Sequence, residues 1–202
     1  MTPLIIAFVA LGSAATAQDW KPLFDGSSLT GWRETAFTGR GKVRVEEGQL
    51  ILGAGGPMTG VTLAKSEFPS QYEVRFEAQR KLGGDFFASL TFPVGTAHLT
   101  WVTGGWGGDI VGISSIDGWD ASDNETRSYY NFELGRWYSF RLQVTPARIR
   151  AWINDEQVVN VAIAGRELSL RRGEIGLSAP FGFASYNTEG RVRKIEWRAL
   201  RQ

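Results

Sequence analysis

Alternating apolar and polar positions recur along most of the chain, and they predict β-strands rather than helices. In residues 71–80 the apolar side chains Tyr72, Val74, Phe76 and Ala78 alternate with charged or polar ones. A period of two places one set of side chains on each face of a strand. One apolar and one polar face are typical of a sheet whose inner side packs against a second sheet. No segment shows a convincing helical period.

Further strands are predicted at regular spacing, separated by turns rich in glycine, proline, asparagine and aspartate. They cover residues 43–46, 49–52, 60–65, 86–93, 97–103, 110–116, 128–132, 136–145, 148–154, 157–163, 174–178 and 191–200. Many short strands with such punctuation favour a sandwich or a barrel. We therefore predict an all-β fold that forms one domain over residues 18–202. Three tryptophans are expected in its core: Trp137, Trp152 and Trp197.

The first residues are predicted to be a signal peptide rather than part of the fold. Residues 3–15 are apolar or small and carry no charge, and Ala15-Thr16-Ala17 fits a small-x-small cleavage site. No lysine or arginine precedes the apolar run, and the run is too short to span a bilayer as a helix. We expect a signal peptide over 1–17, export to the periplasm or the outside, and no membrane span after cleavage.

Composition and charge narrow the class of protein. The 202 residues include no cysteine, so any stability must come from the apolar core, which a chain of this length can supply. Lysine and arginine number 22 and aspartate and glutamate 21, a formal net charge of +1. The basic residues are scattered, so the electrostatic footprint of a nucleic-acid-binding protein is missing and no nucleic-acid partner is expected.

One stretch differs from the strands around it and predicts a binding site. Residues 104–125 hold six glycines, two tryptophans, four aspartates and one glutamate. Sugars offer C–H faces that pack on aromatic rings, and their hydroxyl groups need fixed polar partners. An oligosaccharide or glycoside is therefore the expected partner. The residues expected to bind it are Trp101, Trp106, Trp119, Asp109 and Arg127.

The same stretch supplies candidate catalytic groups. Asp117, Asp120 and Glu125 lie close enough in sequence to converge in a curled loop, and His98 is the only histidine. Such groups would transfer protons if their surroundings separated their pKa values. The alternatives are a solvated acidic turn that bonds to its own backbone, and a histidine that is an ordinary sheet residue.

Metal sites receive weaker support from the sequence. The acidic loop would suit calcium, although its spacing is not that of an EF-hand. A single histidine without cysteine disfavours zinc, and there is no G-x-S-x-G segment for a serine nucleophile. We expect that no cofactor is required, with calcium as the one open possibility.

The segment LFDGSSLTGW, residues 23–32, resembles the opening signature of secreted bacterial 3-keto-disaccharide (3-keto-glycoside) hydrolase-like domains. The later segments AWINDEQVV (151–159) and GEIGLSAP (173–180), and a last strand ending at Arg198, follow the order of motifs in that family. The resemblance covers nearly all of residues 18–202. It implies an antiparallel two-sheet jelly-roll sandwich of the concanavalin A-like type.

The resemblance also implies an activity. The keto group of a 3-keto-glycoside acidifies the proton on C2, and its removal lets the C1 substituent leave by elimination, followed by hydration. The middle of the chain departs from the better-known members: it reads GGDFFASLTFPVG and GGWGGDIVGISSIDG where they carry an NSG…R segment and a GYEVQ-like strand. No catalytic residue of the family is therefore carried over. A non-catalytic carbohydrate-binding module stays open as an alternative, as does an exported structural or adhesion module.

Overall fold

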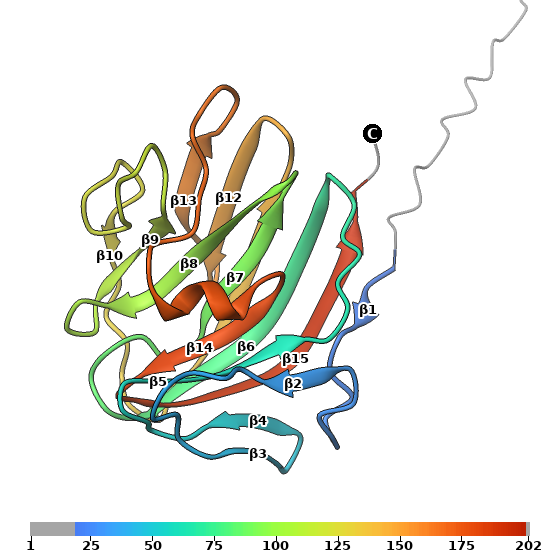
Figure 1. The fold of residues 1–202 in the computed structure, drawn as a ribbon, viewed down its shortest axis with the longest axis vertical. Coiled ribbons are helices and arrows are strands. Elements are labelled where there is room, and N and C mark those ends of the chain that lie inside the picture. Colours follow the sequence, from blue (N-terminus) through green and yellow to red (C-terminus); the bar gives the residue numbers. More distant parts are fainter. Residues whose placement is uncertain (1–18, 201–202) are drawn as a thin grey trace, which may run out of the picture.

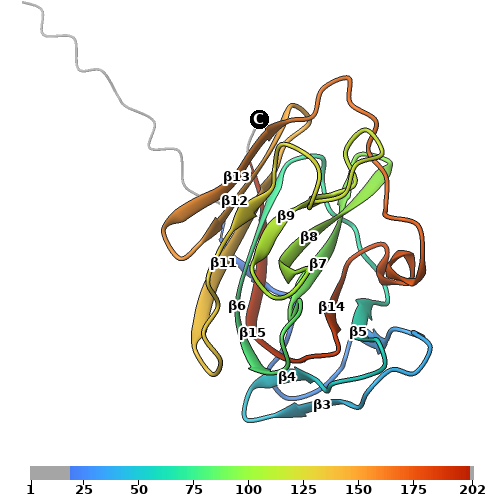
Figure 2. The same ribbon diagram turned by 90° about the vertical axis from the view of Figure 1, so that its left-hand side faces the viewer.

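Two antiparallel β-sheets, packed face to face, make up the protein (Figures 1 and 2). The structure is a computed structural model that describes residues 19–200. The predicted signal peptide lies outside the described residues. No helix in the described part of the chain is both long enough and apolar enough to cross a bilayer.

The larger sheet has eight strands, and the predicted strand 71–80 is one of its central members. Its order is β13 (Glu156–Ala162), β12 (Arg148–Ile153), β11 (Trp137–Val144), β6 (Tyr72–Leu82), β15 (Glu189–Ala199), β4 (Gln49–Leu52) and β3 (Val43–Glu46), and β1 (Lys21–Pro22) pairs with β15.

The second sheet has seven strands and carries the glycine-, tryptophan- and aspartate-rich stretch. Its order is β10 (Ser128–Tyr129), β9 (Ile110–Ser114), β8 (Ala97–Gly105), β7 (Ser89–Val94), β14 (Gly182–Tyr186), β5 (Met58–Leu63) and β2 (Trp32–Glu34). The all-β fold with two antiparallel sheets confirms the sequence-based prediction.

The core lies between the sheets and is rich in aromatic rings. Phe76 on β6 stacks on Phe140 of β11, with ring centroids 4.9 Å apart. Trp101 on β8 meets Phe140 edge-on at 5.6 Å and is completely buried. Aromatic pairs in these two geometries are favourable beyond the area that they bury. The alternation along β6 confirms the predicted pattern, because the four apolar residues of the predicted strand 71–80 all lie in this core.

Two of the three tryptophans predicted in the core are on the outside, so that prediction was wrong for them. Trp137 and Trp152 alternate with inward residues and project from the outer face of the larger sheet. The Arg193 guanidinium lies 4.0 Å from the Trp137 ring centroid, and that of Arg141 lies 3.6 Å from Trp152. Trp197 is partly buried and packs against the core.

The segment predicted as a strand at 174–178 is instead a short 3-10 helix, η1 (Glu174–Ser178). It belongs to residues 164–181, which we call the strap and which cross the outer side of the seven-stranded sheet (Figure 2). The strap exchanges backbone hydrogen bonds with the chain after β9: Ser115 N–H donates to Ser169 O at 2.9 Å, and Ser169 N–H donates back at 3.2 Å. The strap thus forms one side of a hollow over the sheet.

Candidate functional site

A pocket of about 430 Å³ lies on the outer face of the seven-stranded sheet, beneath the strap. Its lining comes from β5, β7, β8, β9 and β14, from the loops before β7 and after β8, and from the strap. The lining residues are Met58, Asp85, Phe86, Ser89, Thr100, Val102, Trp106, Ser114, Arg171, Arg172, Glu174, Ile175 and Tyr186. Pockets of this size, with mostly apolar walls and a few polar groups, are typical of small-ligand sites.

The floor of the pocket is a set of short side chains that point outward because their neighbours point into the core. Thr100 lies opposite Ser114 across β8 and β9, and the next pair in the register, Trp101 and Ile113, is completely buried. The Ser114 Oγ accepts the Ala121 N–H at 2.8 Å, and the Ser89 Oγ accepts the Thr103 N–H at 3.2 Å. The backbone thereby fixes two hydroxyl groups at the floor.

One wall is a small apolar cluster that is separate from the main core. Buried Phe37, Met58 and Ala184 form its centre, and Phe86, Ile175 and Tyr186 pack against it. The rings of Phe86 and Tyr186 lie 5.5 Å apart. Because this cluster joins β5, β14, η1 and the loop before β7, it holds the strap against the sheet and gives the pocket an apolar side.

Trp106 stands at the pocket in an unusual backbone conformation. Its φ is 49°, its side chain is 39% exposed, and Gly104, Gly107 and Gly108 around it also have positive φ. A bulky residue rarely adopts this left-handed region, and such outliers cluster at functional sites. The turn holds the indole at the pocket instead of packing it in the core.

A buried arginine supports this turn from behind. The Arg80 guanidinium donates to Gly108 O at 3.0 Å and to Phe132 O at 2.6 Å. Burial lowers the pKa of Arg80, while the carboxylates of Asp85 and Asp109 act in the opposite direction. A side chain at Gly108 would collide with this guanidinium, because an added Cβ would lie 2.6 Å from its Nη1. Arg80 therefore fixes the position of the Trp106 turn.

Two carboxylates line the pocket, and the sequence analysis named neither. The Asp85 Oδ1 accepts the Phe86 N–H at 2.7 Å, and its Oδ2 has only a long contact of 3.4 Å with the Gly107 N–H. Glu174 is held more closely, since it accepts the Thr38 N–H at 3.1 Å and the Thr38 hydroxyl at 2.5 Å. The Gly83-Gly84-Asp85 turn next to a strand was the available signal for Asp85.

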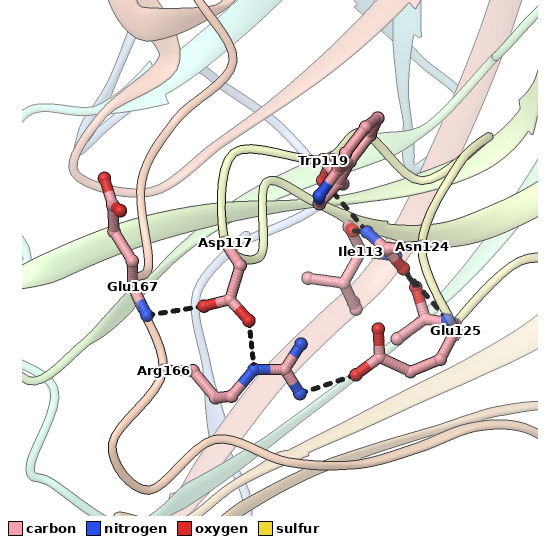
Figure 3. A network of polar contacts seen from close by, with 8 residues as sticks. Ile113, Asp117, Trp119, Asn124, Glu125, Arg166 and Glu167 are labelled. Atoms are coloured by element: carbon pink, nitrogen blue, oxygen red, sulfur yellow. Dashed lines mark hydrogen bonds and ion pairs between the residues drawn. The ribbon is translucent and has the colours of Figure 1, made fainter.

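The acids predicted to be catalytic instead bind the strap. Figure 3 shows the Arg166 guanidinium between Asp117, at 2.5 Å, and Glu125, at 2.6 Å. The Glu167 N–H, and then Arg166, lower the pKa of Asp117, and Arg166 lowers that of Glu125. These two carboxylates raise the pKa of Arg166 in return. We call this group, Arg166 with Asp117 and Glu125, the clasp.

The third predicted acid has a related role. Asp120 accepts the Ser115 hydroxyl at 3.0 Å and pairs with Arg171 at 3.0 Å. The Arg171 guanidinium also lies 5.5 Å from the centroid of the Trp106 ring. Asp120 therefore does not line the pocket, but it holds a residue that does.

The structure corrects two further predictions. Trp101 was expected to contact sugar, yet it is completely buried because it occupies an inward position of β8. His98 was expected to join the acids; it lies near the opposite end of β8 from the Trp106 turn and does not line the pocket. Burial lowers the pKa of His98.

The other predicted binding residues divide between the pocket and its surroundings. Trp106 lines the pocket, whereas Trp119, Asp109 and Arg127 do not. Trp119 is 62% exposed on the loop after β9, and Arg127 donates to Ser122 O at 3.0 Å. Of the five predicted binding residues, only Trp106 thus lines the pocket.

The calcium hypothesis gains no support from this geometry. Asp117, Asp120 and Glu125 turn their oxygens toward arginines and do not converge on one point. Among residues 19–200 there is no group of three or more histidine, cysteine, aspartate or glutamate side chains placed to hold a metal ion.

Comparison with known proteins agrees with this architecture. A family model described as the 3-keto-alpha-glucoside-1,2-lyase-like domain matches residues 19–198. No curated protein gives a significant match.

Solved structures share the fold at low sequence identity. The exoplasmic/lumenal domain of VIP36 in its Ca2+/Man3GlcNAc-bound form has a TM-score of 0.60 and 8% identity, and the match covers 92% of each chain. The carbohydrate-binding module CBM66 from Bacillus subtilis has a TM-score of 0.53 and 11% identity, covering 84% of this chain and 96% of that one. Domain 4 of AbnA, an arabinanase from Geobacillus stearothermophilus, has a TM-score of 0.54 and 14% identity, covering 87% of each chain. These likenesses confirm the predicted concanavalin A-like jelly roll.

Proposed function

The chain belongs to the 3-keto-alpha-glucoside-1,2-lyase-like domain family, and from that premise we propose that its pocket binds a 3-keto-glycoside and cleaves it at C1 by elimination. One observation carries the proposal. Trp106, in a strained backbone conformation, and the weakly engaged carboxylate of Asp85 line the same pocket of about 430 Å³. An exposed indole and a nearby carboxylate are what a sugar ring and a C–H proton transfer require.

The proposed reaction needs a base near C2 and a donor near the oxygen on C3. Asp85 removes the C2 proton, the C–H electrons form an enolate with the C3 carbonyl, and the C1–O bond then breaks with protonation of the departing oxygen. Water adds to the resulting enone and gives the free 3-keto sugar. The Ser89 hydroxyl is suited to donate to the enolate oxygen, because its own oxygen already accepts the Thr103 N–H.

Asp85 takes the role that the sequence analysis gave to the acids after β9. Glu174 is the less suitable base, since both of its oxygens are bonded to Thr38. The leaving group would receive its proton from water or from the Tyr186 hydroxyl at the apolar wall. Export of the protein remains a prediction from the sequence.

The activity is tested by incubation with the α and β methyl 3-keto-glucosides, with release of 3-ketoglucose as the readout. Loss of the general base is expected to lower turnover by about a hundredfold or more, so Asp85→Asn should be nearly inactive. Asp109→Asn is the matched control, because Asp109 lies outside the pocket lining. Wild-type activity in Asp85→Asn would remove Asp85 from the mechanism, and no release by the wild type would remove the lyase activity.

The second candidate is a binding module without catalysis. It is favoured by the shortage of carboxylates: the pocket offers one weakly engaged acid, whereas ordinary glycoside hydrolysis uses a pair. The fold is also shared with a carbohydrate-binding module. Tight binding of unoxidised methyl glucosides, without any product from the 3-keto forms, is the outcome that this candidate requires.

A further inference from the structure

One positive charge at the pocket has no partner among residues 19–200. Arg171 pairs with Asp120 at 3.0 Å, and its guanidinium also lies over the Trp106 ring. The next residue, Arg172, also lines the pocket and is exposed, yet it makes no hydrogen bond or ion pair with any residue in 19–200. An arginine presents donors in a planar fork that matches a carboxylate.

The acids of the lining do not neutralise Arg172. Glu174 accepts two hydrogen bonds from Thr38. Asp85 accepts the Phe86 N–H and lies in the field of the buried Arg80. Each of these carboxylates therefore has other donors or charges around it, and the Arg172 guanidinium remains available to a ligand.

The uncharged groups of the floor point to the same kind of ligand. The oxygens of Ser89 and Ser114 each accept a backbone N–H, from Thr103 and from Ala121. Neither hydroxyl donates a hydrogen bond to a residue that the structure describes, so each retains a hydrogen for the pocket. These two hydroxyl groups add donors to those of the Arg172 guanidinium, and together they favour a ligand that presents acceptors to them.

The position of Arg172 is set from both sides. Upstream, Ser169 exchanges two backbone hydrogen bonds with Ser115, and Arg171 is tied to Asp120. Downstream, Glu174 accepts two hydrogen bonds from Thr38, in the loop after β2. Because the backbone is anchored on both sides of Arg172, less freedom is lost on binding than for an arginine on a free loop.

We infer that the pocket selects glycosides that carry a carboxylate, such as those of a hexuronic acid, and that Arg172 is the residue that recognises it. The inference rests on the proposed function only in taking the pocket to be a sugar site. It goes further by naming an acidic sugar as the ligand class.

The test measures affinity by calorimetry for the methyl α- and β-glucuronosides against the methyl α- and β-glucosides. The wild type should bind a glucuronoside at least about tenfold more tightly, or about 1.4 kcal/mol. Arg172→Gln should abolish the difference by weakening only the acidic ligand, and Arg172→Lys should restore part of it. Arg33→Gln is the matched control, an exposed arginine on β2 of the same sheet outside the pocket lining. Thermal unfolding of each variant shows whether it is folded.

Three outcomes would overturn the inference: equal affinity of the wild type for both sugars, no binding of the glucuronosides, or a preference that survives in Arg172→Gln. The ligands carry no keto group, so the result does not depend on catalysis. A lyase that acts on neutral 3-keto-glucosides without acid preference would contradict only the inference. A pocket that prefers glucuronosides but releases no 3-keto sugar would contradict only the lyase.

Discussion

Trp106 adopts a backbone conformation that destabilises the folded state, and it presents an exposed aromatic ring. Its positive φ places a bulky side chain in a conformation that costs of order 1–3 kcal/mol. The surrounding turn maintains that conformation because Arg80 donates a hydrogen bond to Gly108 O. Any side chain at position 108 would collide with the Arg80 guanidinium. A residue that only needed to fill space would not require this conformation, so we expect Trp106 to be the side chain on which binding depends most.

Trp106→Gly should therefore separate stability from binding. Glycine adopts positive φ without strain, so relief of strain should offset the lost contacts and keep the free energy of unfolding within about 1 kcal/mol of the wild type. Glycoside affinity should fall by about tenfold or more, since sugar packing on the indole is lost. Urea unfolding and calorimetry measure the two quantities. Trp119→Gly, which removes an exposed tryptophan outside the pocket, should leave affinity unchanged; the reverse order of effects would show that Trp119 is the sugar platform.

At the scale of elements, the strap decides where the charged groups of the pocket lie. Arg166 is 49 residues from Asp117 and 41 from Glu125, yet it joins the strap to the loop after β9. Periodicity could predict β6 and its partners because alternation is a local property of the sequence. It could not predict the clasp or the pocket, because those contacts join segments far apart in the chain. The alternation along β8 is also a local property of the sequence. Leu99 and Trp101 lie on the face opposite that of Thr100, and this pattern alone would have placed Trp101 in the core.

Loss of the clasp should loosen the strap and weaken the pocket. Arg166→Gln is expected to speed amide hydrogen exchange at Glu167 and Ser169 and to lower glycoside affinity, because Arg171 and Arg172 are carried by the same segment. Arg150→Gln, on the outer face of the larger sheet, is the control and should change neither. Unaltered exchange in Arg166→Gln would show that the backbone pair at Ser115 and Ser169 suffices to hold the strap.

Acid should reproduce the effect of that substitution in the wild type. The Glu167 N–H, and then Arg166, lower the pKa of Asp117 below its ordinary value of 3.8, and Arg166 lowers that of Glu125 below 4.5. A carboxylate with a lowered pKa in the folded state contributes stability above its ordinary pKa and loses it as the pH falls through the folded value. The difference in stability between the wild type and Arg166→Gln should thus be constant near neutral pH and shrink below about pH 4.

At the scale of the whole molecule, the two sheets present outer faces of different kinds. The strap crosses the outer face of the seven-stranded sheet (Figure 2), and the pocket lies on that face. On the larger sheet, arginines lie over the outward-facing, half-buried tryptophans and pair with glutamates, as Arg193 does with Trp137 and with Glu77 at 2.7 Å. Arginine on a tryptophan face buries apolar surface and satisfies the charge with its neighbours. We therefore expect the outer face of the larger sheet to contribute to stability rather than to sugar binding, because arginines cover its indole rings.

Substitutions on the two faces should have opposite effects. Trp137→Ala and Trp152→Ala remove half-buried rings stacked on Arg193 and Arg141, and each should lower the free energy of unfolding by about 1–3 kcal/mol. Neither should change glycoside affinity, since both side chains project from the sheet that lies behind the core as seen from the pocket. Trp106→Gly should show the converse, with affinity lost and stability kept. Reduced glycoside affinity in the folded Trp137→Ala or Trp152→Ala variant would place a sugar-binding surface on the larger sheet, and the strap-covered pocket would then no longer account for binding alone.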